Sequence, residues 1–202
     1  ESLNNIMEVK STEVMTLPLP ETKGGAFAAS SEKEILEFSR KADAVAIGPG
    51  ISRLAETQKL VRGLITKLDR PLILDADAII ACASKRNVLK DRKYPTIITP
   101  HPGEMARLLG EDVRGIQADR KKITVATSRA YRMVVVLKGY RTVISNARGN
   151  VYVNKTGNSG MSTAGVGDVL TGIITSFVGQ GIEPYSAALV GAYLHGMAGD
   201  LA

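Results

Sequence analysis

The chain has 202 residues with a formal net charge of +6, and 44% of the residues are hydrophobic and 23% charged. This length and composition suit one α/β domain with its own core and leave no room for a second full domain. No apolar run approaches the ~20 residues of a membrane span, and no signal peptide is recognisable, so we expect a soluble, cytoplasmic protein.

Short β-branched runs alternate with amphipathic stretches over the first two thirds of the chain. Each of four runs predicts a buried parallel strand: 44–47, 71–74, 96–99 and 134–137. Four stretches have the length and periodicity of helices: 54–68, 76–83, 103–109 and 117–132. This alternation predicts a mostly parallel sheet with helices on both faces.

The pattern changes after Leu137. Two strand-like runs flank a turn-rich loop and predict a β-hairpin near 142–153. Two helices are expected after it, at about 167–179 and 184–201. Because the chain starts at Glu1 and stops inside a helical run, we expect one domain, 1–202, truncated at both ends.

Polar residues follow each predicted parallel strand: Gly48-Pro49-Gly50, Asp75-Ala76-Asp77, Pro100-His101-Pro102-Gly103-Glu104 and Lys138-Gly139. Ligands of open parallel sheets bind beyond the carboxyl ends of the strands. Taken singly, each loop is explained as a turn, a helix cap or a strand-end charge. Their shared position favours a ligand site, whereas His195 is interpreted as a histidine that packs between helices.

The most informative motif is the run of small residues from Asn158 to Gly167, which ends at Asp168 and leads into an apolar helix. Glycine lets the backbone approach a ligand, and the N–H groups that open a helix bind anions. The motif therefore predicts a phosphate cradle. Asp168 is either a general base toward a substrate hydroxyl or a charge partner of the helix dipole. Phosphoryl transfer depends mainly on positioning and charge stabilisation and needs only a weak general base, so the motif permits phosphorylation of a hydroxyl.

Cysteine, histidine and basic residues limit the other possibilities. The lone Cys82 excludes an intrachain disulfide and is predicted to be buried. His101 and His195 lack ligand spacing, so no metal site built from side chains is expected. The densest basic region, 114–132, has apolar residues at helical spacing and few aromatic side chains for stacking on bases. It favours a solvated helix face over a nucleic-acid surface.

Together these motifs resemble the NAD(P)H-hydrate dehydratase family, which has a ribokinase-like fold. The resemblance rests on the following segments, in the order of the family: 46–51, 74–78, 99–104, 137–139, 157–161 and 165–172. It implies a three-layer α/β sandwich. It also implies ADP-dependent repair of hydrated NADH or NADPH (NADHX or NADPHX), which releases AMP and phosphate. ATP could replace ADP, Mg²⁺ is the expected phosphate partner, and a homo-oligomer is expected without a nucleic-acid or membrane partner.

The resemblance also implies roles for individual residues. Asp168 would meet the substrate hydroxyl, and Gly50 and His101 would contact the hydrated dinucleotide. The ADP would be bordered by two loops: Lys138, Gly139, Tyr140, Arg141 and Thr142, and Asn158, Ser159, Gly160, Met161, Ser162, Thr163, Ala164, Gly165, Val166 and Gly167. The chain departs from the family pattern at Ala164 and at Ser52, where glycine is common.

Two other functions remain open from the sequence. A ribokinase-like kinase for a vitamin precursor or sugar hydroxyl would use the same Asp168, but it would release a stable phosphate ester. A non-catalytic module that binds nucleotide or nucleic acid would be indifferent to Asp168→Asn, and its affinity for a polynucleotide would depend steeply on salt.

Overall fold

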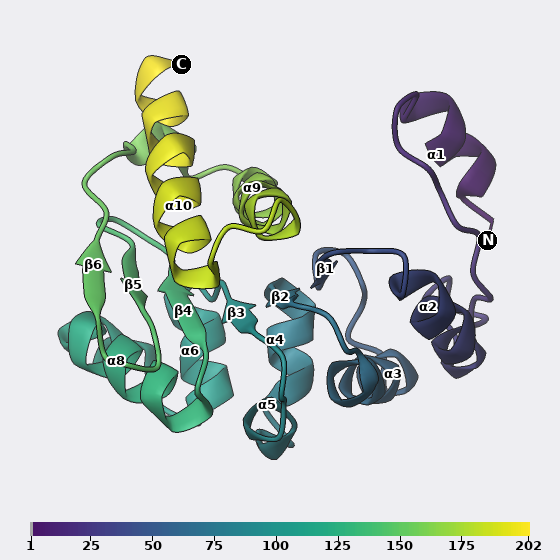
Figure 1. Cartoon of the computed structure of the whole chain (residues 1–202), viewed down its shortest axis with the longest axis horizontal. Helices are drawn as coiled ribbons and strands as arrows, with labels where there is room; N and C mark the ends of the chain where they lie inside the picture. Colours follow the sequence, from purple (N-terminus) through teal and green to yellow (C-terminus); the bar gives the residue numbers. More distant parts are fainter. Residues whose placement is uncertain (1) are drawn as a thin grey trace.

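A single six-stranded sheet forms the centre of the computed structural model, which describes residues 2–202 (Figure 1). Its strands lie across the sheet in chain order: β1 (Val45–Ile47), β2 (Leu72–Leu74), β3 (Thr96–Ile98), β4 (Val134–Leu137), β5 (Val143–Ser145) and β6 (Val151–Val153). Strands β1 to β4 are parallel, and β5 and β6 continue the sheet as antiparallel strands. The predicted parallel strands and the hairpin are confirmed.

From β1 onward the predicted helices are present, but the short helices Asn87–Lys90 and Val113–Ala118 were not predicted, and one predicted helix is broken. The helices are α1 (Asn4–Lys10), α2 (Glu32–Ser39), α3 (Ala55–Lys67), α4 (Ala76–Cys82), α5 (Asn87–Lys90), α6 (Pro102–Leu109), α7 (Val113–Ala118), α8 (Arg120–Tyr131), α9 (Val166–Gly179) and α10 (Pro184–Leu201), with short 3₁₀ turns η1 (Ala29–Ser31) and η2 (Ser159–Met161). The single helix expected over 117–132 is wrong. At Asp119 the backbone leaves the helical region, with φ of −142°, and the Asp119 carboxylate caps α8 by accepting from the backbone N–H of Lys122 at 3.1 Å.

Helices cover both faces of the sheet, which confirms the three-layer α/β sandwich (Figure 1). Successive strand residues point to opposite faces: Leu72 and Leu74 pack with α3, α4 and α6, whereas Ile73 packs with α9 and α10. Because β1 to β4 are neighbours in chain order, right-handed crossovers place all their connecting helices on one face. The other face is covered only when the chain returns after the hairpin as α9 and α10.

The predicted polar loops begin at the same level of the sheet. Backbone hydrogen bonds continue the ladder past the strand ends, from Asp75 N–H to Ile47 O at 3.0 Å and from Thr99 N–H to Leu74 O at 3.0 Å. A third, from Lys138 N–H to Pro100 O at 2.8 Å, reaches the end of β4. The carboxyl ends of all four parallel strands therefore meet at one rim.

Two further expectations concern the rest of the chain. Cys82 is fully buried in α4, as expected, and burial raises the pKa of its thiol to about 12, which makes the thiol unreactive. None of the helices in the described part of the chain is long and apolar enough to cross a membrane.

The loop after β1 requires glycine at one position. Gly48 has φ of +146°, and a Cβ atom there would lie 1.8 Å from the carbonyl oxygen of Asp75. Gly50 has φ of +71°, but nothing lies within 4 Å of its Cβ position. Ser52 has φ of +85°, which explains why glycine suits this position in the family, and its Oγ accepts from the N–H of Leu54.

We therefore expect Gly48→Ala to lower the free energy of unfolding by about 2–4 kcal/mol, because backbone must move to admit the methyl group. Gly50→Ala is the matched control and should cost only the backbone strain, about 1–2 kcal/mol. Urea unfolding of both variants tests this, and equal losses would show that the close approach of Gly48 to Asp75 is unimportant.

Candidate active site

The rim is organised around the buried carboxylate of Asp75, which is 1% exposed. Its Oδ1 accepts from the backbone N–H of Ala76 at 2.9 Å and from Lys138 Nζ at 2.7 Å. Its Oδ2 accepts from Thr171 Oγ1 at 2.8 Å, and Thr171 also lies 3.4 Å from Thr99 Oγ1. Since Thr171 belongs to α9, one carboxylate joins the ends of β2 and β4 to the first turns of that helix.

The amino group of Lys138 lies beside the start of α9. A Cβ atom added to Gly167 would be 3.2 Å from Lys138 Nζ. The helix begins at Gly165, which has φ of +87°, and no side chain caps it. The first N–H groups of α9 therefore have no side-chain acceptor, and they point toward a site where a helix dipole and a lysine are both positive. This arrangement suits an anion, as the sequence motif predicts.

Asp168 is exposed in the first turn of α9, one residue beyond Gly167. Within residues 2–202 its carboxylate makes no hydrogen bond or ion pair with another side chain or with the backbone. It differs in this respect from Asp75, whose two oxygens are both occupied. Asp168 is thus free to accept a proton from a hydroxyl placed beside the anion site.

His101 is the N-cap of α6, a role that the sequence left open. Its Nδ1 accepts from the N–H groups of Gly103 at 3.0 Å and Glu104 at 3.3 Å, while Glu104 Oε2 accepts from the N–H of His101. Its Nε2 lies 3.3 Å from Glu104 Oε1. The cap therefore occupies Nδ1, whereas Nε2 lies near the Glu104 carboxylate but makes no hydrogen bond in the described residues. The side chain is 56% exposed, which leaves the face of the ring open to a ligand.

The loop from Asn158 to Gly167 is fastened to the end of α10. Asn158 Oδ1 accepts from the N–H of Gly160 at 2.8 Å, and Asn158 Nδ2 donates to Asp200 Oδ1 at 3.2 Å. The second oxygen of Asp200 accepts from the N–H of Gly157 at 2.8 Å. The loop leaves this anchor and crosses to the start of α9, where Gly167 meets Lys138. The two predicted nucleotide loops are therefore brought together at these residues.

Tyr140 and Arg141 lie outside that meeting point, although they belong to the predicted nucleotide loop. Tyr140 is 81% exposed, and the Arg141 guanidinium stacks over its ring at 5.4 Å from the centroid. In contrast, Gly50 is exposed at the rim loop after β1. The structure thus places Gly50 and His101 on the loops after β1 and β3, and the loop of His101 borders the loop of Lys138 through the bond from Lys138 N–H to Pro100 O.

His195 packs inside the molecule, as interpreted from the sequence, and it also contacts the site. It is half-buried in α10, and it shares a hydrogen bond with the backbone of Val166, the first residue of α9. Burial lowers the pKa of His195, and the bond to Val166 opposes this effect only in part.

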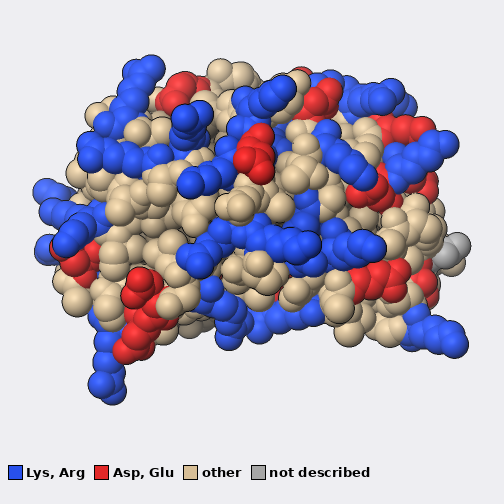
Figure 2. Space-filling view, turned by 90° about the horizontal axis from the view of Figure 1, so that it is seen from below, with Lys and Arg blue, Asp and Glu red and all other residues tan. Residues whose placement is uncertain are grey.

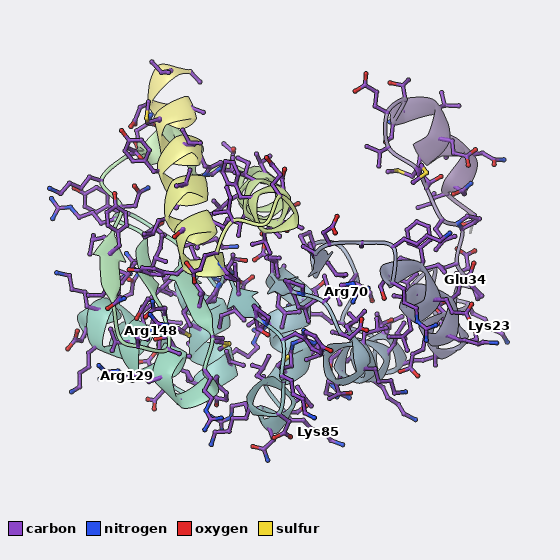
Figure 3. All side chains as sticks on the ribbon, in the orientation of Figure 1. Lys23, Glu34, Arg70, Lys85, Arg129 and Arg148 are labelled. Carbon is purple, nitrogen blue, oxygen red and sulfur yellow. The ribbon has the colours of Figure 1, made fainter. Side chains whose placement is uncertain are left out.

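Basic side chains are spread over the outside of the molecule. Figure 2 shows lysine and arginine mixed with aspartate and glutamate on the side that carries α3, α5 and α8. In Figure 3, Arg129 and Arg148 lie beside α8 and the hairpin, whereas Lys85 lies beside α5. This supports a solvated helix face, with one exception: Arg120 is half-buried and turns toward the end of β4.

The sequence did not reveal the importance of Asp75 or Thr171. Asp75 follows directly after the buried strand β2, which is a usable signal, but the sequence gives no indication that Lys138 and Thr171 are its partners. Thr171 lies 96 residues further along the chain.

Comparison with known proteins shows the family to which the chain is similar. The sequence model of the family described as NAD(P)H-hydrate dehydratase matches residues 3–202. The chain is 49% identical over 198 residues to the bifunctional NAD(P)H-hydrate repair enzyme Nnr of Moorella thermoacetica, with 98% of this chain and 37% of that protein covered. It is 37% identical over 190 residues to the ADP-dependent (S)-NAD(P)H-hydrate dehydratase of Neisseria meningitidis, with 92% of this chain and 64% of that protein covered. The chain therefore spans less than two thirds of these relatives.

Solved structures give the same result. The ADP/ATP-dependent NAD(P)H-hydrate dehydratase from Bacillus subtilis, co-crystallized with ATP/Mg²⁺, matches with a TM-score of 0.69 and 36% identity, and 79% of this chain and 57% of that chain are covered. A ribokinase-like superfamily protein from Enterococcus faecalis matches with a TM-score of 0.76 and 27% identity, and 97% of this chain and 64% of that chain are covered. The fold is therefore ribokinase-like.

We expect Asp75→Asn to lower the free energy of unfolding by about 3–5 kcal/mol, because it leaves the Lys138 ammonium without its buried partner. Asp77→Asn is the matched control, since Asp77 pairs at 2.6 Å with the exposed Arg53 and should contribute much less. Denaturant unfolding measures both. Equal effects would mean that Asp75 does not hold the rim together.

The lowered pKa of His195 predicts a pH dependence of stability. Because the fold favours the neutral ring, the unfolded chain binds more protons below the ordinary pKa of about 6.5. Stability from this group is present above that pH and is lost as the pH falls. The unfolding free energy of His195→Gln should therefore fall less steeply with acid than that of the wild type. An unchanged slope in His195→Gln would contradict the assignment.

Proposed function

The chain belongs to the NAD(P)H-hydrate dehydratase family, and on this premise we propose that it returns hydrated NADH or NADPH to the reduced coenzyme at the expense of ADP. The proposal depends most on one observation: the unpartnered Asp168 lies at the uncapped start of α9, next to the residue that meets Lys138. An anion site with a free carboxylate beside it is what phosphorylation of a hydroxyl requires.

The reaction follows from the chemistry of the hydrated ring, in which hydroxide is a poor leaving group. Transfer of the terminal phosphoryl group of ADP to the ring hydroxyl forms a phosphate ester and AMP. The electron pair of the ring nitrogen then expels phosphate as the C–O bond breaks. Loss of a proton from the neighbouring carbon restores the double bond of the dihydronicotinamide. The products are NADH or NADPH, AMP and phosphate.

Different residues of the rim have different roles in this reaction. Asp168 orients the hydroxyl and accepts its proton as the new P–O bond forms. The N–H groups of Gly165, Val166 and Gly167 and the ammonium of Lys138 stabilise the charge that develops on the transferring phosphoryl group. Asp75 keeps Lys138 in place but cannot act as the base, because its oxygens are already occupied.

The two substrates would approach from different loops. ADP would lie along Lys138–Thr142 and Asn158–Gly167, with its phosphates at the start of α9. The hydrated dinucleotide would contact Gly50, where no side chain obstructs it, and His101. Since the cap occupies Nδ1 of His101, the contact would be made by Nε2 or by the exposed ring face.

Mg²⁺ is the proposed partner of the nucleotide phosphates, and the Bacillus subtilis relative was co-crystallized with ATP/Mg²⁺. Among residues 2–202, no three histidine, cysteine, aspartate or glutamate side chains lie close enough together to hold a metal ion. The ion would therefore be held mainly by phosphate oxygens and water, which suits its preference for keeping several waters.

We also propose a homo-oligomer in the cytoplasm, where the reduced coenzymes are used. The small residues of α10 do not support the oligomer, because Ala187, Gly191 and Ala192 are buried in contact with the rest of the chain. Support comes from Tyr193 and Leu194, which leave more than two fifths of their surface exposed on the same helix.

Asp168→Asn should abolish the return of dihydronicotinamide absorbance when the full-length protein is incubated with hydrated NADH, Mg²⁺ and ADP. We expect a fall of about 10²–10⁴-fold in kcat, because the amide cannot take the proton. ADP affinity should be retained. Asp69→Asn, a change at an exposed aspartate near Arg70, is the matched control and should leave kcat unchanged.

Product analysis separates the alternatives. Formation of AMP and free phosphate along with NADH supports the dehydratase. If a folded protein binds ADP but yields no NADH, the proposal is wrong, and accumulation of a phosphorylated alcohol would favour a ribokinase-like kinase. Polynucleotide binding without turnover would favour a binding module.

A further inference from the structure

The side chain of Arg120 forms hydrogen bonds with the backbone of the loop after β4. Arg120, the first residue of α8, donates from Nη2 to the carbonyl oxygens of Leu137 at 2.8 Å and Lys138 at 3.0 Å. Its Nη1 donates to the carbonyl oxygen of Tyr140 at 2.6 Å. The planar guanidinium fork suits such parallel bonds, which a lysine could not reproduce. Arg120 thus ties the start of α8 to three backbone positions of the loop.

The surroundings of Arg120 are also unusual for a positively charged side chain. Its side chain is half-buried, burial lowers its pKa, and its Nε is buried with no hydrogen-bond partner in the described residues. Within residues 2–202 it forms no ion pair with a carboxylate. A buried charge without an opposite charge is unfavourable. The uncompensated positive charge lies behind the loop that carries Lys138, and so it adds to the attraction for an anion.

The bonds from Arg120 fix which way the loop faces. The remaining carbonyl of the segment, that of Gly139, accepts from Thr142 Oγ1 at 3.1 Å. All four carbonyl oxygens from Leu137 to Tyr140 are therefore occupied. In contrast, the N–H groups of Gly139, Tyr140 and Arg141 make no hydrogen bond within the described part of the chain.

Backbone conformation agrees with this division. Gly139 has φ of +134° and Arg141 has φ of +55°, whereas φ of Tyr140 between them is not positive, so the sign of φ alternates along the turn. Successive N–H groups in such loops form a concave site for anions. Gly139 also lies close to the guanidinium of Arg120, because a Cβ atom there would lie 3.2 Å from Arg120 Nη2.

We propose that Arg120 is a positioning residue for the nucleotide, and that it holds residues 138–142 so that Lys138 and the free N–H groups of Gly139, Tyr140 and Arg141 face the diphosphate of ADP. The assignment rests on the proposed function for the identity of the nucleotide. It adds a residue outside the two loops that border ADP, which acts on the nucleotide only through the backbone of one loop.

The test compares Arg120→Ala with Lys121→Ala in the full-length protein. Lys121 is the next residue of α8 and is exposed, and its side chain makes no hydrogen bond in the described residues, so its removal takes away the same charge but none of the bonds to the loop. Loss of the charged hydrogen bonds should raise the Kd and KM for ADP about tenfold or more. At saturating ADP, kcat should stay within about threefold, because Asp75 still holds the Lys138 ammonium at the start of α9 when Arg120 is removed. Lys121→Ala should match the wild type.

Chemical rescue distinguishes positioning from a general loss of stability. A cavity of about 640 Å³ lined by Arg120, Tyr140 and Val143 lies beside the guanidinium and gives a small cation access. Methylguanidinium should restore the ADP affinity of Arg120→Ala, and methylammonium at the same ionic strength should not. Arg120→Lys keeps the charge but not the fork, and should bind ADP with intermediate affinity.

The outcomes separate this proposal from the proposed function. An unchanged Kd for ADP in Arg120→Ala, or a loss confined to kcat, overturns the positioning role even if the wild type dehydrates hydrated NADH. If the wild type binds ADP without turnover, the proposed function fails, and the change in Kd still decides the role of Arg120. If Arg120→Ala does not fold, an ADP affinity of Arg120→Lys equal to that of the wild type overturns the role.

Discussion

The site depends on one buried carboxylate that cannot be left without partners. Asp75 is 1% exposed, and an isolated charge at that depth would be strongly unfavourable. Its bonds to Lys138, Thr171 and the N–H of Ala76 satisfy it, and the same bonds set the distance between the strand ends and the start of α9. The position of Lys138 beside Gly167 follows from this network. The anion site is thus a consequence of how the fold satisfies a charge in its core.

Two aspartates near the rim differ because their surroundings differ. Asp75 is enclosed and fully bonded, so it holds other groups in place. Asp168 is exposed and free of partners, so it is available to a substrate. The surroundings of His101 limit it in a similar way, because the cap of α6 occupies Nδ1 and leaves Nε2 and the ring face. Arg120 extends the pattern to the backbone, since it occupies the carbonyl oxygens of a loop and leaves the N–H groups of Gly139, Tyr140 and Arg141 open.

Much of the fold could be predicted, because a strand that is buried on both faces is a short, continuous run of apolar residues, and the helices between the strands have one apolar stripe. The prediction failed where this signal is weak. Nothing in the periodicity of 117–132 shows that Asp119 caps a new helix, since α7 and α8 present similar residues on either side of the break. The short helix α1 buries none of its residues, and no pattern distinguishes it from a loop.

The sequence by itself determined the parallel strands, the hairpin, the phosphate-binding motif and Asp168, because each is encoded in residues that are neighbours along the chain. Only the tertiary structure decided which polar residues work together. Asp75 meets Lys138 across strand β3, which lies between their strands, and it meets Thr171 across 96 residues of sequence. In the sequence, Arg120 looks no different from the exposed basic residues beside it, although its side chain turns inward. The physical reason is that periodicity reports which face of an element is buried, whereas the partner of a buried charge is set by the order of the strands and by the return of α9 over the sheet.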